Sequence, residues 1–288
     1  MIEQHSISIF GRGALGSALY DFFRSKSYVI RSVWDRKGGE IYSGKDLPVL
    51  KSEKILPAND HEVGNMIFIA VPDDQIPSLS KQLSLIPIKW ENRSIIHCSG
   101  NLPSNVCNYL ADKGAKVAAM HPIQTFQRGD RLNRFLGIYV TLEGDVKLMD
   151  DLRTIVNDME AHPIQITPEQ KRIIHIASVI ASNYMVSLMH VTETLLNSAG
   201  VEEGIDIFQP LVSQTMQNLF ELGVVESLTG PISRGDLQSV KHHLERLKEN
   251  SHHSEIYKLM GLEAILIAEK KGNVSRETLS TLEQLLKQ

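Results

Sequence analysis

Residues 7–16 read Ile7-Ser8-Ile9-Phe10-Gly11-Arg12-Gly13-Ala14-Leu15-Gly16, an apolar run that passes directly into three spaced glycines. The run predicts a strand, and the apolar spacing of residues 14–25 predicts a helix. Between a strand and a helix, this glycine spacing is typical of the turn that binds a dinucleotide pyrophosphate. Gly11 permits the tight turn, Gly13 lets a phosphate approach the backbone, and Gly16 allows close helix–strand packing. The alternative is a turn that needs glycine for its geometry alone.

The first half of the chain alternates apolar runs with helical stretches, which predicts an α/β doubly wound Rossmann domain over residues 1–166. Met66 to Val71 is almost continuously apolar, as expected for a strand buried on both faces of a parallel sheet. The other expected strands are residues 28–34, 94–97, 115–120, 138–141 and 164–166.

The pattern changes at Thr167 and Pro168, which suit an N-cap and a first helical position. No turn signal appears from there to Asn197, so we expect one helix of about 30 residues. We therefore expect an all-α C-terminal domain over residues 167–288, with residues 228–236 as a loop and Asp236 as an N-cap. Further helices are expected at about 201–222, 236–250, 252–271 and 275–287.

The 288 residues carry 30 Lys and Arg against 34 Asp and Glu, so the formal charge is −4. Length suggests two domains, and the acidic balance argues against general binding to nucleic acid. Two cysteines, Cys98 and Cys107, are typical of a reducing compartment, and no signal peptide is expected. The most apolar later segment, Ile176 to Met189, is shorter than the ~20 residues that span a bilayer. We expect a soluble, cytoplasmic protein with no membrane partner and no metal.

The residues that follow the second expected strand bear on whether the cofactor is NAD or NADP. Asp35 follows Gly16 by 19 positions and suits a ribose hydroxyl of NAD. Arg36 and Lys37 follow at once, and a cation there suits the 2′-phosphate of NADP. The pair favours NADP slightly, although Lys37 also suits a solvated charged turn.

Polar residues follow the later strands of the predicted sheet. Val71 and Pro72 should line the path of the cofactor, while Asp73 and Asp74 suit a helix start. Ser99 and His121 should reach the same crevice, because each follows the carboxyl end of a strand. A histidine there can exchange a proton with a substrate near neutral pH.

Two further candidates come from the helical half. Lys171, His175 and Asn183 form part of a polar stripe on the long helix, which either faces a cleft or bonds neighbouring helices. Arg234 suits a clamp for a substrate carboxylate or phosphate, or a structural ion pair.

Taken together, these motifs resemble the Rossmann-like proteins that carry the domain of unknown function 2520. The residues that carry the resemblance are 11–16, 70–74, 97–100, 121–126, 182–184 and 229–236. It implies a place in the 6-phosphogluconate-dehydrogenase-like superfamily, an NAD(P)-dependent oxidoreductase activity with no established substrate, and a homodimer formed through the helical domain.

Two more distant resemblances bear on mechanism. Ser99 and His121 are placed similarly to the serine and histidine of prephenate dehydrogenases, in which the histidine bonds the substrate hydroxyl. Lys171 and Asn183 are similar to the helix-borne lysine and asparagine of β-hydroxyacid dehydrogenases, although their spacing is wider here.

We therefore predict hydride transfer between NAD(P)H and a small carbonyl, alcohol or imine, at a cleft between the two domains. His121 is expected to donate the proton, with Lys171 and Asn183 directed at the same oxygen. The alternative is a non-catalytic dinucleotide-binding sensor or scaffold. The predicted catalytic residues are Ser99, His121, Lys171, His175 and Asn183, and Arg234 is predicted to bind substrate. The predicted cofactor-binding residues are Gly11, Arg12, Gly13, Ala14, Leu15, Gly16, Asp35, Arg36, Lys37, Val71, Pro72 and Ser99.

Overall fold

The computed structural model describes residues 5–42, 48–127, 129 and 132–288, and divides the chain into two compact units. Unit 1 covers Met1–Ser182 and unit 2 covers Asn183–Gln288. The predicted boundary at residues 166 and 167 coincides with the start of the long helix, whereas the two units divide within that helix.

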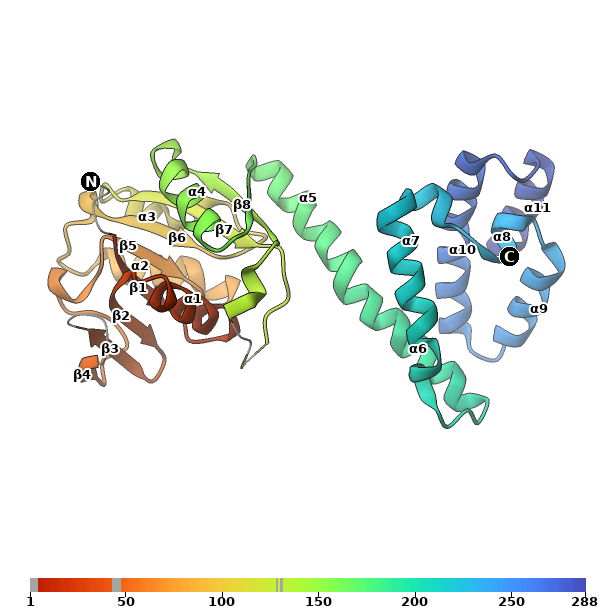
Figure 1. Cartoon of the computed structure of the whole chain (residues 1–288), viewed down its shortest axis with the longest axis horizontal. Helices are drawn as coiled ribbons and strands as arrows, with labels where there is room; N and C mark the ends of the chain where they lie inside the picture. Colours follow the sequence, from red (N-terminus) through yellow and green to blue (C-terminus); the bar gives the residue numbers. More distant parts are fainter. Residues whose placement is uncertain (1–4, 43–47, 128, 130–131) are drawn as a thin grey trace. The chain divides into compact units, whose positions relative to one another are not determined.

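The described part of unit 1 contains a nine-stranded sheet in the order β4-β3-β2-β1-β5-β6-β7-β8-β9 (Figure 1). Five neighbouring strands, β2, β1, β5, β6 and β7, are parallel, which confirms the doubly wound core. The strands are β1 (Ser6–Phe10), β2 (Val29–Asp35), β3 (Gly38–Tyr42), β4 (Pro48–Ser52), β5 (Met66–Ile69), β6 (Ser94–His97), β7 (Lys116–Pro122), β8 (Tyr139–Gly144) and β9 (His162–Gln165).

Helices cover both faces of this sheet (Figure 1). Helices α1 (Ala14–Ser25) and α4 (Met149–Asp158) pack on one face through side chains such as Phe23 and Leu152. Helices α2 (Ile76–Ser84) and α3 (Asn108–Ala111) pack on the other face through side chains such as Leu83 and Leu110. Burial on both sides explains the continuous apolar run of β5.

The structure corrects the sequence prediction at both sides of the sheet. Strands β3 and β4 form an antiparallel extension beyond β2 that was not predicted. Gly38 and Gly39 at the start of β3 suggest a turn. A Cβ on Gly39 would stand 2.2 Å from ring carbons of Trp34, so the Trp34 ring packs against the strand at this glycine. At the other side, β8 runs antiparallel to β7, a direction that an apolar run cannot reveal.

The long helix is confirmed as 31 helical residues from Pro168 to Ser198. Its two α-helical parts are α5 (Pro168–Ser178) and α6 (Tyr184–Ser198), joined by a π-helical turn over Val179–Asn183. Thr167 caps the start as predicted, in a capping box with Gln170.

By length and composition, this helix is also apolar enough to cross a membrane, and its most apolar window is unburied within the described structure. The prediction that the segment is too short to span a bilayer counted only residues 176–189. Ile173, Ile176, Ile180 and Val186 are each more than half exposed. Exposed apolar surface of this kind is typical of an interaction site.

Unit 2 is all helical in its described residues, as predicted. Its further helices are α7 (Gln209–Ser227), α8 (Gly230–Arg234), α9 (Leu237–Leu247), α10 (Ser251–Lys271) and α11 (Arg276–Lys287). The predicted loop over residues 228–236 contains α8, which was missed because Gly230 and Pro231 read as turn residues. Asp236 caps α9 as predicted, by accepting a hydrogen bond from the Ser239 amide at 3.0 Å.

Candidate functional site

The glycine turn after β1 has the conformation that the spacing predicts. Gly11 has a positive φ of 106°, and its amide donates a hydrogen bond to the Trp34 carbonyl at 2.8 Å. A Cβ on Gly11 would stand 2.4 Å from the Ala70 oxygen, and one on Gly16 would stand 1.9 Å from the Gly11 oxygen. Both glycines are therefore required by close backbone packing.

Gly13 differs from these two glycines. Its φ of −71° suits any residue, and a Cβ there would meet no described atom within 4 Å. Gly13 also stands at the N-terminus of α1, where backbone amides attract anions. The turn therefore leaves open space at the point where a pyrophosphate would approach.

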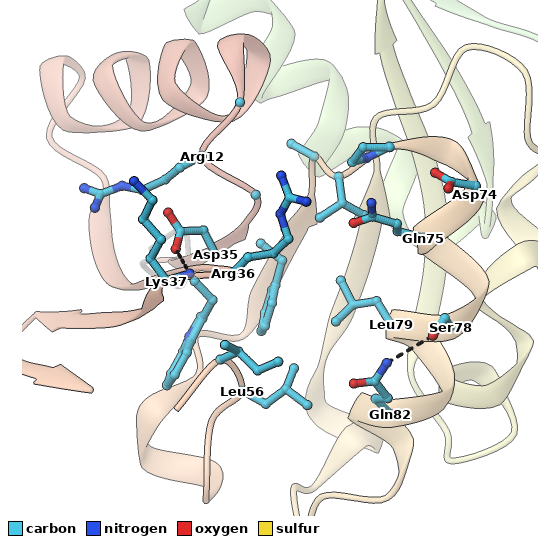
Figure 2. A pocket seen from close by; sticks show the side chains of 18 residues that line it. Arg12, Asp35, Arg36, Lys37, Leu56, Asp74, Gln75, Ser78, Leu79 and Gln82 are labelled. Atoms are coloured by element: carbon cyan, nitrogen blue, oxygen red, sulfur yellow. Dashed lines mark hydrogen bonds between the residues drawn. The ribbon is translucent and has the colours of Figure 1, made fainter. Parts of the chain in front are cut away.

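A cavity of about 590 Å³ opens beside this turn, within the usual size range of ligand pockets (Figure 2). It lies at the carboxyl ends of β1, β2 and β5, with α2 along its other side. Predicted cofactor residues that line it are Gly11, Arg12, Gly13, Asp35, Arg36, Lys37, Val71 and Pro72. Its lining in the described chain does not include Ala14, Leu15, Gly16 or Ser99.

Cations dominate one side of the cavity. Arg36 extends its guanidinium into the cavity and makes no ion pair in the described structure (Figure 2). Arg12 instead pairs with Glu40 at 2.8 Å. Burial opposes the charge on Arg12, but the Glu40 carboxylate outweighs that effect and raises the Arg12 pKa. Asp35 accepts the Lys37 amide hydrogen at 2.6 Å, which fixes the turn after β2.

A second group of polar residues lies around the ends of β6 and β7 in unit 1. Ser99 donates its hydroxyl hydrogen to Asp73 at 2.7 Å and accepts the amides of Asn101 and Leu102. These bonds give Ser99 a structural role at the turn after β6. They also correct the interpretation of Asp73 as an N-cap, since its carboxylate bonds to Ser99 and caps no helix in the described chain.

His121 is held at the end of β7 by the backbone of the neighbouring strand. Its Nδ1 lies 3.2 Å from the Cys98 carbonyl oxygen. A carbonyl only accepts, so Nδ1 carries the hydrogen and Nε2 presents a lone pair. Burial, opposed in part by the Cys98 carbonyl, lowers the pKa of His121 to about 4. His121 is therefore neutral at pH 7.

Lys171 on α5 is the most unusual residue of this group. Its side chain is 1% exposed, and within the described structure its Nζ has no hydrogen-bond partner. Burial lowers the Lys171 pKa to about 8, although the Glu143 and Asp73 carboxylates oppose that shift. Lys171 is thus still mostly charged at pH 7, and an unpaired buried charge is costly.

Two residues of this group were missed by the sequence analysis. Buried Glu143 on β8 accepts the Ser104 amide and hydroxyl at 2.7 and 2.8 Å. Gly100 leaves room for two imidazoles, because a Cβ there would stand 2.6 Å from Nε2 of His121 and 2.8 Å from Nδ1 of His175. The glycine directly after Ser99 was a usable signal, whereas the position of Glu143 depends on the antiparallel β8.

The structure thus brings Ser99, His121, Lys171 and His175 together in unit 1. Asn183 begins unit 2 and is exposed, and Arg234 is exposed at the end of α8. Their assignments stay predictions. Among the described residues, no group of three or more His, Cys, Asp or Glu side chains is arranged to hold a metal ion.

Known proteins support the fold. No curated protein sequence matches the chain. BF3122 from Bacteroides fragilis, a proposed NADP oxidoreductase, has a similar structure with a TM-score of 0.71 at 19% identity, covering 93% of this chain and 100% of its own. Protein TM1727 from Thermotoga maritima has a TM-score of 0.66 at 25% identity, over 92% and 99% of the two chains.

A reductive aminase from Aspergillus terreus, solved with NADPH4, cyclohexanone and allyl amine, is more distant. Its TM-score is 0.59 at 14% identity, and the match covers 99% of this chain and 93% of the aminase. The model of the domain of unknown function 2520 matches residues 138–264, which span the end of unit 1 and most of unit 2. Residues 138–264 therefore match the domain of unknown function 2520, and the chain has a Rossmann-like fold.

Proposed function

We propose that the protein is an NAD(P)-dependent oxidoreductase. The observation that carries this proposal is the open space at Gly13, which faces a cavity lined by Arg36 and Lys37. The residues fit a dinucleotide, because amides at the start of α1 suit the pyrophosphate and the cations suit a 2′-phosphate. The NADP-linked descriptions of BF3122 and the reductive aminase agree with this cofactor class.

The bound nicotinamide would supply a hydride donor or acceptor, and the residues of this chain would orient the substrate and handle its proton. His121, Lys171 and His175 are the groups in unit 1 that we assign to this task, and we assign Asn183 and Arg234 to substrate contacts. Lys171 favours an enzyme over a sensor or scaffold, because its buried Nζ has no hydrogen-bond partner among the residues that the structure describes.

Titration of the purified protein with NADPH and NADH, followed by cofactor fluorescence, tests the proposal. We expect saturable binding of at least one dinucleotide. Binding of neither dinucleotide would reject the oxidoreductase assignment and the sensor alternative together.

We expect NADPH to be preferred, and Arg36→Ala to weaken NADPH far more than NADH. A charge-assisted hydrogen bond contributes on the order of 1.5–3 kcal/mol, which is more than tenfold in affinity. Dissociation constants for both dinucleotides, measured with the wild type and the variant, give the result. Arg153→Ala is the control, because Arg153 pairs with Asp150 on α4, outside the cavity. Equal losses for both cofactors would instead favour Asp35 and the ribose hydroxyls as the discriminating contact.

We also propose a soluble, cytoplasmic homodimer formed through the helical unit. Large apolar side chains on α6 and α7 are exposed, including Val186, Leu211, Phe220 and Val224. A surface of this kind fits a second copy of the chain, which presents the same apolar side chains.

Sedimentation velocity without detergent should give a mass of about 65 kDa, twice the 32.3 kDa of one chain. Phe220→Asp should shift the protein toward the monomer, because an interface core excludes charge. Leu85→Asp in unit 1 is the matched control, since Leu85 and Phe220 are both 79% exposed. A monomeric wild type, or a protein recovered only with membranes, would contradict the proposal.

A further inference from the structure

The two arginines that line the cavity beside Gly13 are held in different ways. Arg36 extends into the cavity from the turn after β2 and makes no ion pair in the described structure (Figure 2). Arg12 extends its guanidinium away from Arg36 and from α2 (Figure 2). Its Nη2 lies 2.8 Å from Oε2 of Glu40. The cavity therefore has one arginine that can meet a ligand anion and one that is already paired.

Glu40 is fixed on β3 by a second contact of its own. Tyr42 lies two residues further along the strand, on the same face, and donates its hydroxyl hydrogen to Oε2 of Glu40 at 2.9 Å. Burial opposes the charge on Glu40, but the hydrogen bonds from Arg12 and Tyr42 outweigh that effect and lower the Glu40 pKa. Glu40 is therefore a carboxylate at pH 7, and two donors share one of its oxygens.

Arg12 also lies near the place where a ribose would bind. It stands between Gly11 and Gly13 in the glycine turn, and the charge of Asp35 at the end of β2 acts on it. An acidic residue at that position suits the ribose hydroxyls of a dinucleotide. The planar guanidinium of arginine matches a phosphate as well as a carboxylate. A phosphate on that ribose and the Glu40 carboxylate would thus compete for the same guanidinium.

We propose that Glu40 is a specificity-determining residue, which holds Arg12 away from the cofactor and so limits the preference for a 2′-phosphate. This inference rests on the proposed function and adds to it a residue that does not line the cavity in the described structure. The ion pair neutralises the Arg12 charge, and a carboxylate near the ribose repels a phosphate. NADPH must then rely on Arg36 and Lys37, whereas NADH has no 2′-phosphate to be affected. The arrangement fits a protein that accepts both dinucleotides.

Glu40→Gln in the full-length protein tests the inference. Glutamine keeps the length of the side chain and an oxygen for the Tyr42 hydroxyl, but it loses the charge that holds Arg12. NADPH and NADH differ only by the 2′-phosphate, so the ratio of their dissociation constants isolates this contact. We expect NADPH to bind on the order of tenfold tighter, the usual effect of one charge-assisted hydrogen bond. The affinity for NADH should change by less than about twofold, because NADH lacks the competing anion.

Arg12→Met separates the release of Arg12 from a general change in charge. In the wild-type background this substitution should alter NADPH affinity little, because Glu40 already holds the guanidinium. In the Glu40→Gln background it should remove the gain, since two residues that act through one contact are not additive. Glu160→Gln is the control: Glu160 pairs with Lys26 at 3.4 Å, and neither residue lines the cavity. It should leave both affinities unchanged.

The opposite sign in Glu40→Gln would overturn the inference. If Glu40→Gln and Arg12→Met each weaken NADPH, then Glu40 positions Arg12 for the phosphate instead of holding it away. An unchanged affinity for NADPH in Glu40→Gln, or a gain that persists after Arg12→Met, would also overturn it. The wild-type titrations report on the proposed function separately, because a protein that binds neither NADPH nor NADH rejects that function itself.

Discussion

Gly13→Val is expected to leave unit 1 folded and to abolish binding of both NADPH and NADH. The backbone of Gly13 has ordinary extended angles, and its missing Cβ faces open space in the described structure. A valine there costs the fold little, because it neither strains the chain nor strikes a neighbour. Its branched side chain would instead occupy the space where a pyrophosphate must contact the amides of α1.

Fluorescence titration of the dinucleotides and thermal unfolding, measured on the same preparation, separate binding from folding. We expect an unfolding temperature close to the wild-type value and a loss of affinity of a hundredfold or more, since a clash removes the pyrophosphate contacts altogether. Gly16→Ala is the informative control, because its Cβ would stand 1.9 Å from the Gly11 oxygen and should destabilise the fold. If the Gly13→Val protein binds NADPH with an affinity within threefold of the wild-type value, the cavity is not the dinucleotide site of the proposed function.

This contrast between glycines shows what the sequence could predict about the cavity beside the turn. The spacing of Gly11, Gly13 and Gly16 between a strand and a helix was enough to predict the turn. The salt bridge between Arg12 and Glu40 was not predictable, since Glu40 lies on β3. That strand begins with two glycines, which weaken a strand signal, and lies in the antiparallel extension between β2 and β4.

The cluster around Lys171 was predictable in membership but not in chemistry. Strand ends and helical spacing pointed to His121, Lys171 and His175. Whether a histidine nitrogen donates or accepts depends on which backbone oxygen lies next to it, and a sequence pattern does not give the distance between those two atoms. Glu143 was missed for a similar reason. It lies opposite Ala119 in the antiparallel pairing of β8 with β7, and that pairing brings it to the cluster.

Lys171→Met is expected to raise the free energy of unfolding while it removes most of any turnover. The lysine side chain is 1% exposed, and no hydrogen bond to its Nζ exists among the residues described. Methionine has a similar length and no charge to desolvate, so the gain should be about 1–3 kcal/mol after loss of the attraction to Glu143. Turnover should fall by ~10²–10⁴-fold, the usual contribution of a positioned proton donor or charge.

The effect on stability should depend on pH in a defined direction. The Lys171 pKa is about 8 in the folded protein against 10.5 for an ordinary lysine, chiefly because of burial. Between these two values the unfolded chain holds a proton that the folded protein has released. Wild-type stability therefore gains with rising pH across this window, and the advantage of Lys171→Met should shrink from pH 8 to about pH 10.5.

Urea unfolding of both proteins at a series of pH values from 6 to 10.5 measures this difference. Lys113→Met, which changes an exposed lysine of the same unit, should show no advantage at any pH. Stability of Lys171→Met below the wild-type value at pH 7 would mean that Lys171 stabilises the fold, and its buried charge would lose its functional interpretation. If Lys171→Met is more stable than the wild type only at lower pH, the wild-type protein retains a destabilising ammonium near the ends of β6 and β7, as a functional site often does. That result would support the assignment of Lys171 to the substrate site in the proposed function, because the lysine would lower the stability of the protein without a structural benefit.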